Sequence, residues 1–231
     1  MPKESQQVDA NLDRIPLFSA LDDEAALALR QTMVPQTLKK GKHLFQEGEP
    51  GDRLYIVLEG KIKLTHASGD GRESLLMVLG PGDMFGELSL FDPGPRTATA
   101  VAVTDSEVLG LGNTDLRPWL NGRPEVAQAL LQALAHRLRR TNEIMSDLVF
   151  ADVPGRVAKA LIELGEKFGS RSATGLVVNH DLTQEELAQL VGASRETVNK
   201  ALADFASRGW IRLETRCVEI FDIERLSRRA K

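Results

Sequence analysis

A carboxylate lies between apolar residues in the segment 86–89, Gly-Glu-Leu-Ser, directly after a glycine. Arg96 and Thr97 come after the turn-rich segment Asp-Pro-Gly-Pro at 92–95. The glycine would let the backbone approach a ligand closely, and an arginine with a hydroxyl could take up one anionic group. This pattern indicates a site for a small polar ligand. The alternative is an exposed ion pair between Glu87 and Arg96, and composition alone favours it because such pairs are common at surfaces.

A second group of polar side chains follows Ser194. Arg195 and Glu196 would lie in the first turn of a helix, and Lys200 would lie one turn beyond Glu196. Arginine and lysine can donate to O6 and N7 of guanine, and glutamate can accept from N4 of cytosine. A glutamate near DNA phosphates costs affinity, so its place in this group favours base readout over general anchoring. We expect this helix to read G·C pairs in a major groove.

Capping and turn signals position that helix. Thr183 followed by Glu186 is a capping box that begins a first helix, and Gly192 supplies the turn before Ser194 caps the second. Two short helices joined by such a turn are typical of a helix-turn-helix, and the polar start of the second helix argues against a plain helical hairpin. The apolar residues that can pack the two helices together are Leu187, Leu190, Val191, Val198, Leu202 and Phe205.

The segment 150–156, Phe-Ala-Asp-Val-Pro-Gly-Arg, predicts a hinge between two other helices. Asp152 is a suitable N-cap, and Pro154 fits the first turn of the next helix. That helix should run to about Lys167, and the residues 169–175 should form a flexible loop. Further on, two alternating runs predict the strands of a wing, 210–213 and 218–221.

Glycines recur between positions 41 and 94 and separate short apolar or alternating runs. Short strands at about ten-residue spacing with turn signals predict an antiparallel barrel or jelly roll rather than βαβ units. Ile62 and Leu64 alternate with lysines and should face inward. A short helix over Ala20–Thr32 should precede the strands. The predicted runs are Leu54–Leu58, Ile62–Leu64, Leu75–Leu79, Ala98–Val103 and Val108–Leu111.

The longest predicted element is a helix from Pro124 to Phe150. Its apolar residues recur at spacings of four and three, which is the seam of a two-stranded coiled coil. The alternative is an amphipathic helix that lies along its own domain. Thr141 and Asn142 interrupt the middle of the seam, and polar side chains in an otherwise apolar interface suggest a further role for these two residues. The seam consists of Ala127, Leu131, Leu134, Leu138, Thr141, Met145 and Leu148.

Bulk composition narrows the class of protein. The 231 residues suggest one large or two modest domains, and the net charge of −4 argues against a generally basic nucleic-acid binder. A single cysteine excludes a disulfide framework, and the scattered histidines argue against a metal site. The sequence contains no nucleophile–base set, so we do not expect an enzyme. No apolar run approaches about 18 residues, so we expect a soluble, cytoplasmic protein with no membrane segment or signal peptide.

Three of these motifs, in this order, resemble the CRP/FNR family of bacterial transcription factors and within it the cyclic-AMP receptor branch. They are Gly-Glu-Leu…Arg-Thr within 86–97, the hinge at 150–156, and Ser-Arg-Glu-Thr-Val at 194–198. The first looks like the phosphate-binding cassette of cyclic-nucleotide-binding domains. In that likeness Arg96 would neutralise the cyclic phosphate, and Glu87 would accept a hydrogen bond from the ribose 2′-hydroxyl. The cysteine clusters of the iron–sulfur branch are absent, which argues against an oxygen sensor.

The resemblance implies an α+β fold in three parts. These are an N-terminal β-roll (jelly-roll) cyclic-nucleotide-binding domain at 1–123, a long dimerisation helix at 124–150, and a C-terminal winged helix-turn-helix DNA-binding domain at 151–231. It implies cyclic AMP as an allosteric ligand and no metal. The implied partners are double-stranded DNA, a second copy of the chain bound through 124–150, and RNA polymerase, with no membrane. The nucleotide-binding residues it implies are Leu64, Leu76, Gly86, Glu87, Leu88, Ser89, Arg96, Thr97, Arg137, Thr141 and Asn142. The DNA-binding residues it implies are Thr183, Gln184, Ser194, Arg195, Glu196, Thr197 and Lys200.

Two positions depart from the best-known members of the family. Asn142 stands at a serine position next to the adenine, with Thr141 beside it and Arg137 one turn earlier. The carbonyl of Asn142 could accept from adenine N6 and its amide could donate to guanine O6, so cyclic AMP and cyclic GMP both stay open. Lys200 stands where an arginine is known. The implied DNA target is a TGTGA-like half-site in an inverted repeat.

Two other functions share part of this pattern. A family member with a vestigial cassette would bind DNA constitutively, without nucleotide. A cyclic-nucleotide-binding regulatory module of an enzyme or channel would share the cassette but would have no use for the helix-turn-helix.

Overall fold

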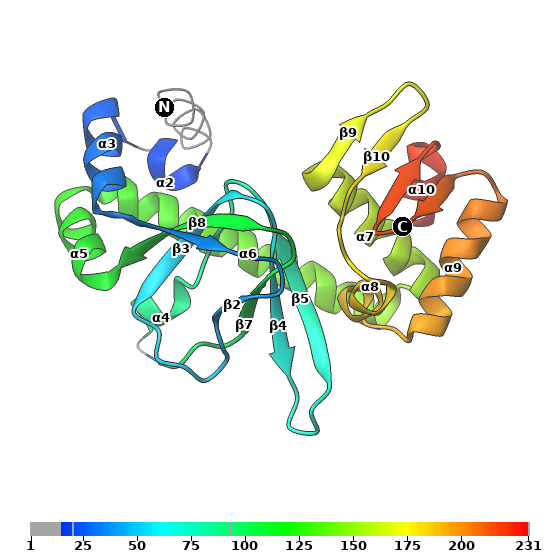
Figure 1. Ribbon diagram of the computed structural model, residues 1–231, viewed down its shortest axis with the longest axis horizontal. Coiled ribbons are helices and arrows are strands. Elements are labelled where there is room, and N and C mark those ends of the chain that lie inside the picture. The colour runs from blue at the N-terminus through cyan, green and yellow to red at the C-terminus, as the bar shows by residue number, and fades with distance from the viewer. Residues whose placement is uncertain (1–14, 20, 93, 231) are drawn as a thin grey trace. The chain divides into compact units, whose positions relative to one another are not determined.

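Two β-sheets form the framework of the N-terminal part of the molecule (Figure 1). The computed structural model describes residues 15–19, 21–92 and 94–230. One sheet has the strand order β1-β8-β3-β6 and the other has the order β2-β7-β4-β5. The strands are β1 (Val34–Leu38), β2 (His43–Phe45), β3 (Arg53–Glu59), β4 (Ile62–Ala67), β5 (Glu73–Leu79), β6 (Met84–Phe85), β7 (Thr99–Ala102) and β8 (Ser106–Gly112).

This arrangement confirms the predicted roll of short antiparallel strands. Each of the five predicted runs falls on a strand, and Ile62 and Leu64 are buried as expected. The strands β1, β2 and β6 were not predicted. Pro35 interrupts the pattern of β1, which pairs on one side only, as an edge strand containing proline can. The strands β2 and β6 have three and two residues, too few for an alternation, and form through pairing with β7 and β3.

One face of the β1-β8-β3-β6 sheet packs against helices. Alternate residues of β3, Leu54, Ile56 and Leu58, belong to this core, whereas Tyr55 points to the other face. The helices are α2 (Pro16–Ser19), α3 (Asp23–Thr32) and α5 (Asn113–Gly122). The core also receives the start of a fourth helix, α6 (Pro124–Phe150). The buried members are Ile15, Leu17, Phe18, Leu29, Met33, Leu54, Ile56, Leu58, Leu90, Leu109, Leu111, Leu116, Val126 and Leu130.

The short helix expected near the N-terminus is α3. Asp22 caps it by accepting a hydrogen bond from the backbone N–H of Ala25 at 2.8 Å, so the helix begins at Asp23. Ala25 and Leu29 bury one face, as the spacing predicted. Ala20, the first residue of the predicted helix, lies outside the described residues.

Helix α6 has the predicted bounds, Pro124 to Phe150. Its buried residues are Val126, Ala129 and Leu130, which lie in its first two turns. The seam residues Leu131, Leu138 and Met145 are 66%, 63% and 61% exposed. The apolar stripe therefore does not cover the domain that the helix begins on, and the alternative of a helix lying along its own domain fails for most of its length.

The chain divides into two compact units. One contains residues through His66 together with Val78–Arg140, and the other contains Ala67–Met77 together with the chain from Thr141 onward. The division falls inside α6, so the helix contributes to both units. The three-domain division expected from the sequence, with boundaries at 123/124 and 150/151, stays a prediction.

The C-terminal unit combines four helices with a small sheet (Figure 1). Asp152 caps the first helix by accepting from Gly155 N–H at 2.9 Å, as predicted for the hinge. The helices after the hinge are α7 (Val153–Phe168), α8 (Gln184–Val191), α9 (Arg195–Ser207) and α10 (Ile223–Arg229). The strands β9 (Gly169–Arg171), β10 (Leu176–Val178), β11 (Ile211–Glu214) and β12 (Cys217–Ile220) form a sheet in the order β11-β12-β10-β9.

The loop predicted at 169–175 is wrong for its first three residues. Gly169–Arg171 forms β9 and pairs antiparallel with β10, in the register Leu176 opposite Arg171. Gly-Ser-Arg has little intrinsic strand preference, so the pairing with β10 determines its conformation. The wing strands β11 and β12 agree with the two predicted runs to within a residue.

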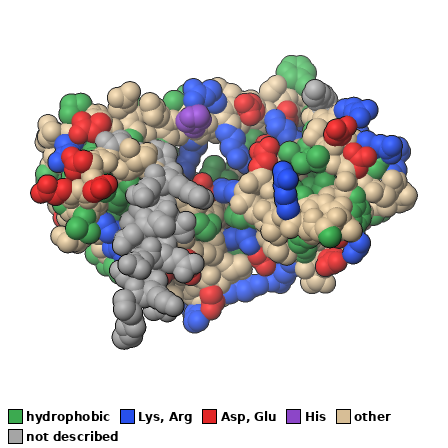
Figure 2. Space-filling model, turned by 90° about the horizontal axis from the view of Figure 1, so that it is seen from above, with side chains coloured by type: hydrophobic (Ala, Val, Ile, Leu, Met, Phe, Trp, Pro, Cys, Tyr) green, Lys and Arg blue, Asp and Glu red, His purple; other side chains and the backbone are tan. Residues whose placement is uncertain are grey.

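Basic and acidic side chains are interspersed on the visible face of the molecule (Figure 2).

Among the helices of residues 15–19, 21–92 and 94–230, none has the length and apolar character needed to cross a lipid bilayer.

Candidate functional site

Arg96 is the centre of the first candidate site. Its side chain is buried, with the residue 5% exposed, and its terminal nitrogens donate three hydrogen bonds. Nη1 donates to the carbonyl of Gly86 at 2.9 Å and to Ser89 Oγ at 3.1 Å, and Nη2 donates to the carbonyl of Arg53 at 2.9 Å. These contacts hold the guanidinium plane in one orientation.

An aromatic cluster lies against the same guanidinium. The Cζ atom of Arg96 lies 4.2 Å from the centroid of the Phe45 ring and 5.7 Å from that of Tyr55. Phe45 and Tyr55 stack at 5.8 Å, and Phe85 stacks on Tyr55 at 5.5 Å. Burial lowers the pKa of Arg96 from its ordinary value, and the charges of Asp52 and Glu49 oppose that shift only in part. This cluster was not predicted from the sequence, because its members come from three separate strands, β2, β3 and β6.

The buried cation makes no ion pair with any residue that the structure describes. Within the described part of the chain the hydrogen bonds of Arg96 go to carbonyl and hydroxyl oxygens, and its Nε–H has no hydrogen-bond partner. Burying a charge without a counter-charge is costly. The arrangement therefore favours an anion beside Arg96.

Glu87 has a different partner. It is 1% exposed, and its Oε1 accepts a hydrogen bond from Arg137 Nη1 of α6 at 2.5 Å, while Arg137 Nη2 donates to the carbonyl of Met84 at 2.7 Å. The other oxygen, Oε2, is buried and has no partner among the described residues. Glu87 and Arg96 are thus both buried with separate contacts, so the alternative of an exposed pair between them is not what the structure contains.

The local backbone explains why glycine precedes Glu87. Gly86 has φ +78°, and a Cβ there would lie 2.8 Å from Arg96 Nη1. Glu87 is the N-cap of α4 (Leu88–Phe91), a one-turn helix that the sequence argument did not predict. Ser89 of this helix is buried and faces Arg96, whereas Leu88 is exposed.

The structure gathers five of the predicted nucleotide-binding residues around one place: Gly86, Glu87, Ser89, Arg96 and Arg137. Leu64 is buried on β4, and Thr97 is exposed directly after Arg96. Leu88 is exposed in the same unit, and three further predicted residues, Leu76, Thr141 and Asn142, are exposed and belong to the other compact unit. No group of three His, Cys, Asp or Glu residues within the described ranges could hold a metal ion.

The second candidate site is the α8–α9 pair. Thr183 Oγ1 accepts from Glu186 N–H at 3.1 Å and Glu186 Oε2 accepts from Thr183 N–H at 2.7 Å, which is the predicted capping box. Gly192 ends α8 with φ 69°, and Ser194 caps α9 by accepting from Thr197 N–H at 3.2 Å. Ser194 and Thr197 therefore hold the start of α9.

Helix α9 separates its buried and exposed faces. Val198, Ala201, Leu202 and Phe205 are buried. Arg195, Glu196 and Lys200 are exposed near its N-terminus, and neither Glu196 nor Lys200 has an ion-pair or hydrogen-bond partner among the described residues. The side chain of Gln184, the first residue of α8, accepts hydrogen bonds from α9. This polar face is free to contact another molecule.

Arg156 links the hinge to the turn between α8 and α9. Its Nη1 donates to the carbonyl of Ala151 at 2.8 Å, and its Nε and Nη2 donate to the carbonyls of Val191 and Gly192 at 3.0 and 3.2 Å. These contacts of Arg156 were not predicted from the sequence, because their acceptors are backbone carbonyls, which any residue type supplies.

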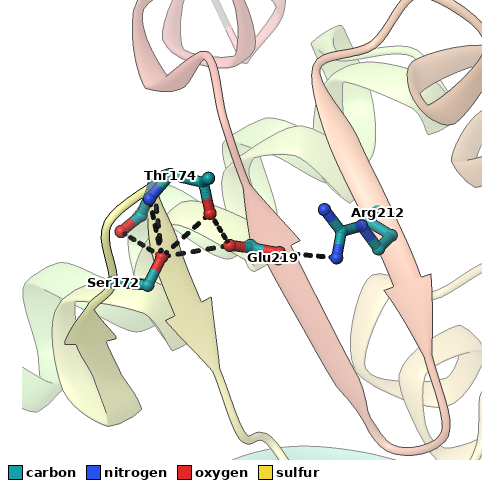
Figure 3. Close-up of polar contacts among 5 residues, drawn as sticks. Ser172, Thr174, Arg212 and Glu219 are labelled. Carbon is teal, nitrogen blue, oxygen red and sulfur yellow. Dashed lines mark hydrogen bonds and ion pairs between the residues drawn. The ribbon is translucent and has the colours of Figure 1, made fainter.

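The wing sheet contains a buried carboxylate (Figure 3). Glu219 Oε1 accepts from Ser172 Oγ at 3.0 Å and from the hydroxyl of Thr174, and Oε2 lies 3.3 Å from Arg212 Nη1. The hydroxyl of Thr174 is the main cause that lowers the pKa of Glu219. Glu219 thereby ties the segment between β9 and β10 to the wing strands and pairs with Arg212 of β11.

Comparisons with known proteins identify the two parts of the chain that contain the candidate sites. The chain matches the cyclic nucleotide-binding domain family over residues 35–122 and the Crp-like helix-turn-helix domain family over residues 155–229. It is 54% identical over 224 residues to the "CRP-like cAMP-activated global transcriptional regulator" of Mycobacterium tuberculosis, covering 97% of this chain and 100% of that protein. The chain belongs to the CRP/FNR family.

Two further relatives extend the comparison. The "Cyclic AMP receptor protein" of Thermus thermophilus is 39% identical over 209 residues, covering 89% of this chain and 92% of that protein. FixK2 from Bradyrhizobium japonicum, at 23% identity, shares the fold with a TM-score of 0.77 over 86% of this chain and 98% of that one. The protein is a transcription regulator with a cyclic nucleotide-binding domain and a helix-turn-helix domain, and it is not an enzyme.

Proposed function

We propose that the protein is a cyclic-AMP-responsive, dimeric regulator that binds palindromic DNA sites in the cytoplasm. The observation that carries the ligand is the buried Arg96, which makes no ion pair among the described residues and has an unpartnered Nε–H. A cyclic 3′,5′-phosphate carries one negative charge and would neutralise it. Two relatives, named for activation by cyclic AMP and for cyclic AMP reception, support this ligand.

Other groups around Arg96 would bind the ribose and the remaining oxygens of the phosphate. Glu87 Oε2, buried and without a partner among the described residues, would accept a hydrogen bond from the ribose 2′-hydroxyl, the one ribose hydroxyl that cyclisation leaves free. Ser89, Thr97 and the backbone at Gly86 and Leu88 would donate to the phosphate. Leu64 and Leu76 would contact the ligand through apolar atoms.

The base would be read from α6. Arg137 is already tied to Glu87, and Thr141 and Asn142 follow it one turn later on the same helix. Thr141 and Asn142 would contact the base, with the Asn142 carbonyl accepting from adenine N6. The opposite orientation of the Asn142 amide would donate to guanine O6, so cyclic GMP is the competing ligand.

Helix α6 would also form the dimer interface. Its exposed seam, from Leu131 to Leu148, has the heptad spacing of a parallel two-stranded coiled coil. Such an apolar stripe in water is stabilised by burial against a second copy. A dimer brings two helix-turn-helix units together, and two-fold symmetry calls for an inverted repeat with half-sites about 34 Å apart.

On DNA, the exposed start of α9 would enter the major groove. Arg195 would contact guanine, Glu196 would accept from cytosine N4, and Lys200 would donate to a further guanine, giving a TGTGA-like half-site. Thr183, Gln184, Ser194 and Thr197, at the helix N-termini, would contact phosphates. RNA polymerase is the further partner that a transcription regulator of this kind would recruit.

Ligand binding would act through a shift between two arrangements of the DNA-binding units. A ligand can shift such an equilibrium only by binding one arrangement better than the other. Residues of α6 in both the proposed ligand site and the proposed dimer seam would supply that difference. A constitutive DNA binder with a vestigial cassette is the second candidate. The regulatory module of an enzyme or channel is disfavoured because the chain contains a helix-turn-helix.

The test combines calorimetry with DNA binding. Cyclic AMP should release or absorb heat with the intact protein and not with Arg96→Gln, whereas the exposed-arginine control Arg117→Gln should bind normally. Fluorescence anisotropy on a TGTGA-like palindrome, without nucleotide and with cyclic AMP or cyclic GMP, separates the alternatives. Equal DNA affinity in all three conditions would support the constitutive binder and refute the ligand-responsive regulator.

A further inference from the structure

The side chain of Gln184 joins the two helices of the helix-turn-helix. Its Oε1 accepts a hydrogen bond from Asn199 Nδ2 at 3.2 Å and another from Arg195 Nη2 at 3.4 Å. Gln184 is the first residue of α8, Arg195 is the first of α9, and Asn199 lies one turn further along α9. One oxygen atom is thus shared by two donors that lie on the same side of the recognition helix.

The orientation of Asn199 depends on this contact. Its Oδ1 is buried and has no hydrogen-bond partner within the described ranges, so the Nδ2 bond to Gln184 is what orients the amide. If the Asn199 amide alone turned over, its oxygen would face Gln184 Oε1, and the hydrogen bond from Nδ2 would be lost. Asn199 therefore acts as a fixed donor that holds the Gln184 oxygen in place.

The position of the Gln184 oxygen determines how Arg195 is oriented. With Gln184 Oε1 held toward α9, one N–H of Arg195 Nη2 has an acceptor before DNA binds. Each terminal guanidinium nitrogen carries two hydrogens, so the second N–H of Nη2 and the N–H groups of Nη1 stay available for O6 and N7 of guanine. An exposed arginine with fewer rotamers to lose forms a bidentate contact at a lower entropic cost.

We propose that Asn199 and Gln184 are positioning residues, which orient Arg195 for a guanine contact and so increase discrimination at one base pair. The inference deepens the proposed function, because it rests on Arg195 as the reader of that guanine. It also changes the expected role of Gln184. Its oxygen belongs to the recognition helix, and only its Nε2 is left to donate to a phosphate. Asn199 was not among the predicted DNA-binding residues, since its role depends on a contact 15 positions away in sequence.

The experiment compares full-length variants on two DNA duplexes. One is a TGTGA-like palindrome, and the other has the G·C pair assigned to Arg195 replaced by A·T in both half-sites. The variants are Gln184→Ala, Asn199→Asp and Arg195→Ala, and Gln189→Ala serves as a glutamine control on the same helix. Asn199→Asp keeps the side-chain shape but presents no N–H, so Gln184 must turn its amide toward the carboxylate and withdraw its oxygen from Arg195.

We expect Gln184→Ala and Asn199→Asp each to reduce the ratio of the two affinities by roughly threefold to tenfold, the range for loss of one hydrogen bond. In the Arg195→Ala background neither change should reduce the ratio further, because its target is gone. Gln189→Ala should leave the ratio unchanged. Far-ultraviolet circular dichroism and thermal melting confirm that each variant folds.

Two results would overturn different claims. If Arg195→Ala loses discrimination while Gln184→Ala and Asn199→Asp keep it, or weaken binding to both duplexes equally, the positioning role is wrong and the proposed function stands. If Arg195→Ala itself keeps the wild-type ratio, the assignment of Arg195 to a guanine fails, and the positioning role fails with it.

Discussion

Replacing Gly86 with alanine should disable the ligand site while leaving the fold intact. Gly86 has φ +78°, and an added Cβ would lie 2.8 Å from Arg96 Nη1, about 0.6 Å inside the ordinary contact distance of 3.4 Å. The added Cβ would also lie 3.3 Å from the carbonyl oxygen of Arg53 and 3.4 Å from the ring of Tyr55, so it cannot move away from Arg96. The guanidinium must therefore move.

The size of the effect follows from the hydrogen bonds that move with it. Nη1 donates to Gly86 O and to Ser89 Oγ, so the displacement loses or weakens two of the three bonds that orient Arg96. The loss of one charge-assisted hydrogen bond costs about 1.5–3 kcal/mol, which is roughly a 10- to 150-fold loss of cyclic AMP affinity. The left-handed backbone adds about 1–2 kcal/mol of destabilisation that is independent of the ligand.

A matched glycine separates the two contributions. Gly48 has φ +86°, and a Cβ there has nothing within 4 Å, so Gly48→Ala carries the backbone strain alone. Both variants should lower the melting temperature by a similar amount, whereas only Gly86→Ala should lose cyclic AMP binding in calorimetry. Equal cyclic AMP affinity of the two variants would refute the reasoning that Arg96 is held for the ligand by its contacts at Gly86.

Three further predictions test other parts of the molecule. Leu138→Glu places a charge in the exposed seam of α6 and should shift the protein from dimer to monomer in sedimentation velocity, while Gln132→Glu, off the seam, should stay dimeric. Thr183→Ala removes the N-cap of α8 and should lower the free energy of unfolding by about 1 kcal/mol, measured by urea denaturation; an unchanged midpoint would contradict the capping role. The side chain of Arg229, and next the N–H of Gly155, lower the pKa of Asp152 below the ordinary 3.8. That stabilisation is present above about pH 4 and is lost as pH falls through the folded-state pKa, so melting temperatures measured from about pH 6 to about pH 2.5 should fall less for Asp152→Asn than for the native protein.

Patterns within a few residues predicted much of the secondary structure. The capping box at Thr183 and Glu186, the turn at Gly192 and the cap at Ser194 all form as expected, because each depends on hydrogen bonds between residues at most about four apart. The bounds of α6 were predictable for the same reason, since a long heptad pattern and an N-terminal proline are local signals. The short strands β2 and β6 were not predictable, because their pairing partners, β7 and β3, lie far away in the chain. The strand β9 was not predictable because Gly-Ser-Arg has little strand preference of its own, although its partner β10 follows closely.

The candidate site divides in the same way. The residue types and spacing of Glu87 and Arg96 indicated a site for a polar ligand. The same pattern also fitted an exposed ion pair between these two side chains, so it could not show whether they are buried. Only the tertiary structure decided that Arg96 is buried against Phe45 with carbonyl partners, and that Glu87 is paired with Arg137. The physical reason is that burial and hydrogen-bond partners depend on strands and helices up to 53 positions apart, which no local pattern encodes. The sequence alone determined the groups that can perform the chemistry, and the tertiary structure determined their contacts and their charge balance.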